Sequence, residues 1–214
     1  MQLPIGTILL IIVAILAYFG LLHRILDRMR LSDTAALVIA LLMAAGTFLD
    51  IPISRGNIQV RANAGGAIIP LALVIWLVAT ADEASEKASS VFAVLATGVV
   101  VWGLTKVLSP EEQFMSFSPM LAFGIAAGIV AAVAGRSRRA AFAGGIGGIL
   151  VADIIHLIEL SVRKMPGAVA FGGAGTFDAT VVAGILAVAL VELVGEVRER
   201  AVKSGGGRGN ESEK

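Results

Sequence analysis

Long apolar runs separated by short polar segments recur along the whole chain. Runs of about 18 or more apolar residues are typical of helices that cross a lipid bilayer. The pattern predicts seven helices, over residues 3–22, 34–51, 66–80, 89–108, 119–134, 140–160 and 177–194. We therefore expect an all-α, polytopic membrane protein with about seven transmembrane helices.

The composition agrees with a membrane domain. Of the 214 residues, 57% are hydrophobic and only 15% are charged, and a soluble domain could not bury that much apolar surface. The chain has no cysteine, which excludes disulfide frameworks and thiolate ligands. The net charge of +1 gives no reason to expect nucleic-acid binding. We expect no cofactor and no bound metal.

Lysine and arginine in the loops predict how the chain is oriented. With the N-terminus outside, twelve of the 17 basic residues fall on the inner side and the other five on the outer side. We expect one transmembrane domain, residues 1–200, in the cell (inner or plasma) membrane, with a cytoplasmic C-terminus. Residues 201–214 are glycine-rich and polar, which predicts a disordered cytoplasmic tail.

Two glycine-rich segments resemble each other. "RANAGGAIIP" precedes the third predicted helix, and "VAFGGAGTFD" precedes the seventh. In each, a short extended piece leads into Gly-Gly-Ala and then into a helix, and the expected orientation places both loops outside. These segments suggest a 3+1+3 parallel repeat over 1–81 and 119–195, with a connector helix over 89–108. The alternative is chance matching of short Gly/Ala strings.

Glycines also recur at a spacing of four residues in two neighbouring predicted helices. Gly124 and Gly128 lie in the fifth helix, and Gly144 and Gly148 lie in the sixth. Small residues at this spacing let helix backbones approach closely in lipid. The two motifs predict a tight contact between these two helices.

Ionisable residues inside the predicted spans are the first candidates for function. Asp153 lies near the middle of the sixth helix, and His156 and Glu159 follow at steps of three residues on adjacent parts of one face. Asp178 stands at the start of the seventh helix, where free backbone amides favour a carboxylate. The structural alternatives are a helix cap for Asp178, a buried polar pair for Asp153 and His156, and a solvated Glu159.

Three hypotheses follow from these residues. In the first, Asp153 and Asp178 are the catalytic acid and base of an intramembrane aspartyl protease, which requires a loop that re-enters the membrane. In the second, the protein transports a small polar solute or ion along a path between the two glycine loops, with Asp153 and His156 as a proton relay or coupling-ion site. In the third, it is a non-catalytic membrane assembly factor.

The first two hypotheses share one set of predicted substrate-binding residues. They are the loop residues and the histidine: Asn63, Gly65, Gly66, Gly172, Gly173, Gly175 and His156. The expected partners are the lipid bilayer and either a transmembrane peptide or a small polar solute.

The motifs carry two resemblances. "NAGGAIIP", "VADIIHL" and "GGAGTFD" together resemble an uncharacterised family of prokaryotic multi-pass membrane proteins, known as a domain of unknown function. Asp153 and Asp178 are also similar to the paired aspartates of presenilin-type and prepilin-type intramembrane proteases, which implies a catalytic pair. Thr176 and Phe177 separate Gly175 from Asp178, so the Gly-x-Gly-Asp motif of those proteases is not reproduced.

Overall fold

The computed structural model describes residues 31–108, 119–173 and 176–206, together with the single helical positions 8, 11, 12 and 15. In the last range, side chains are described for 179–197. Most of the helix predicted over 3–22 and the end of the predicted tail, 207–214, lie outside the described residues. Residues 201–206, also predicted as tail, belong to the last helix.

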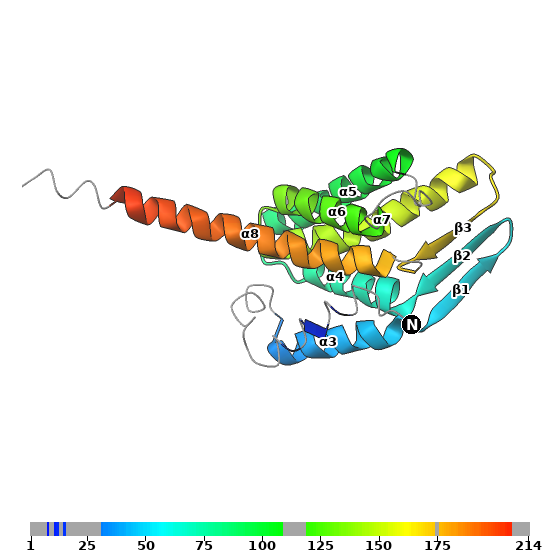
Figure 1. Cartoon of the computed structure of the whole chain (residues 1–214), viewed down its shortest axis with the longest axis horizontal. Helices are drawn as coiled ribbons and strands as arrows, with labels where there is room; N and C mark the ends of the chain where they lie inside the picture. Colours follow the sequence, from blue (N-terminus) through cyan, green and yellow to red (C-terminus); the bar gives the residue numbers. More distant parts are fainter. Residues whose placement is uncertain are drawn as a thin grey trace, which may run out of the picture.

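Within the described ranges the chain forms six α-helices and a small sheet (Figure 1). The helices are α3 (Asp33–Gly46), α4 (Ile69–Ala79), α5 (Ala84–Val107), α6 (Pro119–Gly135), α7 (Arg138–Val162) and α8 (Thr176–Gly206). A π-helical turn, η1 (Ala64–Ile68), leads directly into α4. In this part of the chain three helices, α5, α7 and α8, are long and apolar enough to cross a membrane. These helices indicate a membrane protein, while the count of seven spans and the orientation stay predictions.

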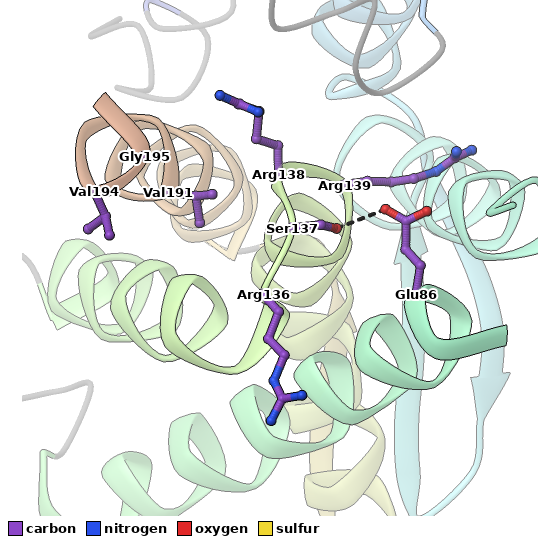
Figure 2. A pocket seen from close by; sticks show the side chains of 8 residues that line it. All are labelled: Glu86, Arg136, Ser137, Arg138, Arg139, Val191, Val194 and Gly195. Carbon is purple, nitrogen blue, oxygen red and sulfur yellow. Dashed lines mark hydrogen bonds between the residues drawn. The ribbon is translucent and has the colours of Figure 1, made fainter. Parts of the chain in front are cut away.

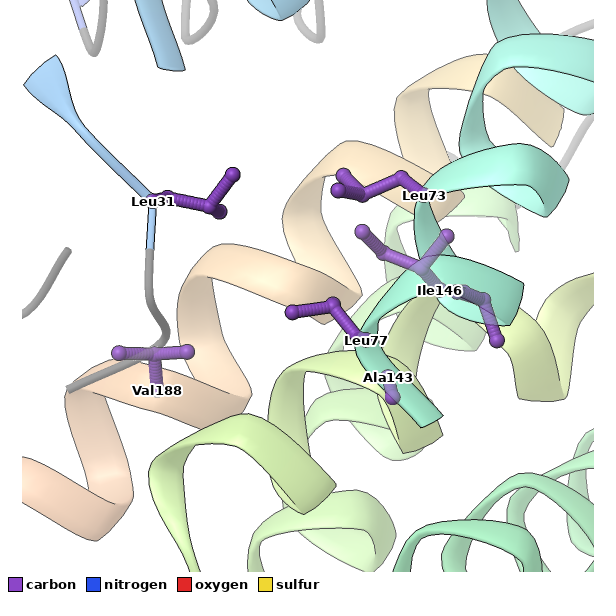
Figure 3. Close-up of a cluster of buried hydrophobic side chains, with 7 residues drawn as sticks. Leu31, Leu73, Leu77, Ala143, Ile146 and Val188 are labelled. Carbon is purple, nitrogen blue, oxygen red and sulfur yellow. The ribbon is translucent and has the colours of Figure 1, made fainter. Parts of the chain in front are cut away.

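Helix α7 lies at the centre of the bundle and packs against α4, α5, α6 and α8. Small residues allow these close contacts: Gly145 of α7 lies against the backbone of α8 at Ala183, and a Cβ on Gly145 would overlap that backbone. A further apolar cluster joins α7 to α4 and α8 (Figure 3). Its buried residues are Leu31, Leu73, Val74, Leu77, Ala143, Ile146 and Val188.

The predicted contact between the helices of the two spaced-glycine motifs is present, since α6 and α7 pack against each other. Gly144 of α7 lies close to Ala131 of α6. The other motif glycines face other helices, since Gly124 of α6 packs against α8 and Gly148 of α7 packs against α5. Helix periodicity alone does not say which neighbour each glycine faces.

A three-stranded sheet is the main departure from the all-α expectation. The strands are β1 (Asp50–Arg55), β2 (Ile58–Asn63) and β3 (Gly167–Phe171), in the order β1-β2-β3. β1 and β2 form an antiparallel hairpin, and β3 pairs with β2 in parallel. The helix predicted over 34–51 therefore ends early, at Gly46, because its last residues belong to the hairpin.

The sheet lies at one end of the bundle, here called the sheet end, where α7 ends and α4 and α8 begin (Figure 1). The two extended pieces predicted before the Gly-Gly-Ala segments are β2 and β3, and Ala62 pairs with Phe171 in their register. The turns that follow also meet, because a Cβ on Gly66 would overlap the carbonyl of Gly172. The sheet thus fixes the starts of α4 and α8 relative to each other, and the complete 3+1+3 repeat stays a prediction.

Candidate functional site

A cavity of about 180 Å³ lies between α5, α6, α7 and the first turn of α8. Most of its lining is apolar, and its polar side chains are Thr105, Asp153 and His156. The other lining residues are Val101, Met120, Phe123, Ile149, Ala152 and Ala179. Two residues singled out by the sequence, Asp153 and His156, therefore line one cavity.

Asp153 is the residue in this cavity that most needs an explanation. Its carboxylate accepts a hydrogen bond from the backbone of Gly172, in the turn that leaves β3. Its Oδ2 atom is buried and has no hydrogen-bond partner among the described residues. Unpartnered polar atoms are costly and uncommon inside proteins, and they cluster where a ligand or a reaction uses them. Asp153 is therefore the centre of the candidate site.

The turn after β3 brings the backbone to Asp153, and its conformation requires glycine. Gly172 has a φ of +62°, in the left-handed region that residues with a Cβ rarely adopt. The same residue packs against the backbone of Gly66. One short turn therefore joins the sheet, the start of α4 and the carboxylate of Asp153.

Asp178 lies in the first turn of α8, which begins at Thr176. Its side chain and the whole of Gly175 lie outside the described residues. The next residue, Ala179, is buried and lines the cavity with Asp153. The backbone at the start of α8 therefore reaches the same cavity, and pairing of the two carboxyl groups stays a prediction.

Asn63 holds the other glycine turn together. Its Nδ2 donates to the carbonyl of Thr47 at 2.7 Å and to Oδ1 of Asp50 at 2.8 Å. Its Oδ1 accepts from the backbone N–H of Gly66 at 2.8 Å, which caps η1. The side chain is only 4% exposed. Asn63 thus makes three structural hydrogen bonds, and its predicted role in substrate binding stays untested.

The glycines predicted to bind substrate are used in backbone packing. A Cβ on Gly65 would overlap the end of α3 at Met43, and Gly66 and Gly172 face each other. Gly173 has more space, with Ala170 as the nearest neighbour. Of the predicted substrate-binding set, His156 is the member that lines the described cavity around Asp153.

Glu159 has a larger role than the sequence indicates. The sequence favours a solvated side chain, but the side chain of Glu159 is only 12% exposed. It accepts from the indole N–H of Trp102 at 3.1 Å, pairs with Lys106, and lies 3.2 Å from Arg163. Nδ1 of His156 is 3.8 Å from it. Glu159 therefore joins α7 to α5 one turn beyond the cavity, a contact that no local pattern in α7 could reveal.

A larger pocket, of about 460 Å³, lies at the opposite end of the bundle (Figure 2). It is lined by Glu86, Arg136, Ser137, Arg138, Arg139, Val191, Val194 and Gly195. The three arginines point in different directions around the start of α7. Arg138 pairs with Glu192, and Arg139 donates to Thr80. These contacts tie the start of α7 to its neighbours and do not converge on one ligand.

Substitution of Ser137 tests whether the pocket residues stabilise the start of α7. Its hydroxyl accepts from the backbone N–H of Ala140 at 3.1 Å and donates to Glu86 at 2.9 Å. Ser137→Ala removes the cap and is expected to lower the free energy of unfolding by about 0.5–2 kcal/mol. Denaturant titration in detergent measures the change. The control is Ser161→Ala, whose exposed hydroxyl bonds only the carbonyl of Leu157, and an equal loss in both variants would contradict the prediction.

The described residues include no group of three or more histidine, aspartate or glutamate side chains placed to hold a metal ion. The site is therefore built around one carboxyl group, one imidazole and a glycine turn. The carboxyl group and the imidazole can transfer protons and form hydrogen bonds.

Of the comparisons with known proteins, one identifies a related family. No curated protein and no solved structure matches the chain. A family model matches residues 25–190, which include both glycine turns, Asp153 and Asp178. The chain belongs to the family described as protein of unknown function (DUF1614).

Proposed function

We propose that this membrane protein is an intramembrane aspartyl-protease-like hydrolase in which Asp153 and Asp178 are the catalytic pair. The observation that carries the proposal is the carboxyl group of Asp153. It has a buried oxygen without a partner among the described residues, in a cavity also lined by the first turn of α8. Asp178 belongs to that turn.

The proposed reaction needs two carboxyl groups with different protonation. In a low-dielectric site two neighbouring carboxyl groups do not both ionise, so they hold one proton between them. The ionised aspartate takes a proton from water, and the hydroxide adds to the carbonyl carbon of the peptide bond. The protonated aspartate then gives its proton to the amide nitrogen as the C–N bond breaks, which yields a carboxylic acid and an amine.

The surroundings of Asp153 suit this role. The backbone N–H of Gly172 fixes one side of the carboxylate. Phe123, Ile149 and the other apolar lining residues make most of the surroundings of the carboxyl group non-polar. The cavity volume of about 180 Å³ is enough for several water molecules.

Proton-coupled transport of a small solute is the second candidate, and one observation favours it. Asp153 and His156 share a cavity, as a proton-coupling site would require. The predicted path between the glycine turns has less support, because Gly66 and Gly172 pack backbone against backbone. Proton-driven uptake of solutes into liposomes would favour transport over hydrolysis.

The test of the proposed function is cleavage of single-span peptide reporters by the purified protein in liposomes. The proposal expects cleavage within the membrane-embedded part of at least one reporter. A panel of reporters should vary the side chains around the expected cut from small to large, because the cavity lining does not identify one preferred side chain. Full cleavage retained by either Asp153→Asn or Asp178→Asn would reject the proposal.

A further inference from the structure

One carboxyl oxygen of Asp153, Oδ2, is shielded from solvent, although the residue as a whole is only partly buried. Asp153 lies nine positions before Val162, where α7 ends at the sheet end. At the rise of an α-helix this places it roughly 14 Å below that end. Most of the cavity lining around it is apolar, so another titratable side chain of the cavity is the group best placed to pass a proton to this oxygen.

His156 is the other titratable side chain among the lining residues, and it also reaches the surface. It lines the cavity with Asp153, yet its side chain is 43% exposed. Three residues separate the two on α7, which puts them on adjacent parts of one helix face. An imidazole ring has two nitrogens, so it can take up a proton at one while releasing one at the other.

The charged groups around His156 do not block proton transfer by its ring. On its own helix, Glu159 lies 3.8 Å from Nδ1 and orients the ring, and Arg163 pairs with Glu159. On α5, Lys106 also pairs with Glu159. The cavity residues contributed by α6 and by the described side chains of α8 are apolar: Met120, Phe123 and Ala179. The two cations described near the ring are thus paired with Glu159, and the ring lines the cavity while 43% of its side chain is exposed at the protein surface.

We propose that His156 carries protons between the medium at the sheet end and the carboxyl group of Asp153. Only a proton moves: the imidazole accepts it from the medium and passes it to the carboxylate, and the reverse returns it. The inference shares with the proposed function only the assumption that Asp153 is the working group. It does not require that the protein cleaves peptides.

The experiment is a pH jump followed by time-resolved infrared spectroscopy of the purified protein in liposomes. The carboxyl band of Asp153 is identified as the band that disappears in Asp153→Asn. In His156→Gln its exchange rate is expected to fall by roughly 100-fold. His23→Gln is the matched control, since His23 is the only other histidine of the chain, and it is expected to exchange at the wild-type rate.

Chemical rescue separates proton transfer from a structural role. In His156→Ala, free imidazole in the medium is expected to restore the exchange rate, which a merely structural defect would not allow. Unchanged exchange in His156→Gln, or slow exchange that imidazole does not rescue, would overturn the inference. Slow and rescuable exchange without any peptide cleavage would support the relay and reject the proposed hydrolase function.

Discussion

Asp153→Asn is expected to reduce peptide cleavage by roughly 10²–10⁴-fold while the protein stays folded. The asparagine amide has nearly the shape of the carboxyl group but can neither accept nor release the proton that the reaction needs. Stability is expected to change little, because the substitution removes a negative charge from a mostly apolar cavity but leaves a polar NH₂ group in place of the oxygen. Cleavage of a reporter and thermal unfolding in detergent measure the two effects separately.

Asp50→Asn is the matched control for this prediction. Asp50 is the carboxyl group that accepts a hydrogen bond from Asn63 in the hairpin, far along the chain from the cavity residues. Its loss is expected to cost stability but to leave cleavage per folded molecule unchanged. If Asp153→Asn kept full cleavage, or if both variants lost cleavage only in proportion to unfolding, Asp153 would not be catalytic.

Gly172→Ala is expected to cause the largest loss of stability among single substitutions in the described chain. Alanine would have to keep the φ of +62°, which is unfavourable for a residue with a Cβ. Its Cβ would also overlap the backbone of Gly66 in the facing turn. Left-handed backbone strain and overpacking together cost roughly 2–5 kcal/mol. Because the Gly172 backbone also bonds Asp153, cleavage by the remaining folded protein is expected to fall as well.

Gly103→Ala is the control for replacing a glycine that has no close contact with a neighbouring segment. Gly103 lies inside α5, and a Cβ there would meet nothing within 4 Å. The substitution is expected to be neutral or to stabilise the helix by up to about 1 kcal/mol. Denaturant titration of both variants gives the comparison, and a Gly172→Ala protein as stable as Gly103→Ala would show that the two turns do not depend on their close contact.

The helices follow from the sequence because apolar runs of sufficient length are a local signal. Six of the seven predicted helices have a counterpart in the described chain, although α3 is shorter than predicted. Strand β2 was predicted as an extended piece, but β1 was missed because its first residues continue an apolar run. The length of that run was given more weight than the alternation of Ile51, Ile53 and their neighbours. The pairing of β2 with β3 joins segments over 100 residues apart and has no local signature.

The centre of the site, Asp153, was predictable because an ionisable side chain is unusual at its position. A carboxyl group in the middle of an apolar helix is costly, and this singled out Asp153. The bond from Gly172 to Asp153 and the pairing of Lys106 with Glu159 depend on how β3 and α5 pack beside α7. Those contacts come from tertiary structure, so spacing within one helix could not predict them.

The central claim is that Asp153 and Asp178 share one site, and cysteine cross-linking tests it most directly. The chain contains no cysteine, so the double variant Asp153→Cys, Asp178→Cys carries the only two thiols. Arg55→Cys with Gln59→Cys is the positive control, since the two residues lie opposite each other in the antiparallel register of β1 and β2. The account predicts that an oxidant or a two-carbon bis-thiosulfonate reagent links the two introduced thiols within one molecule. No link by either reagent, in a preparation where the control pair links, would contradict it.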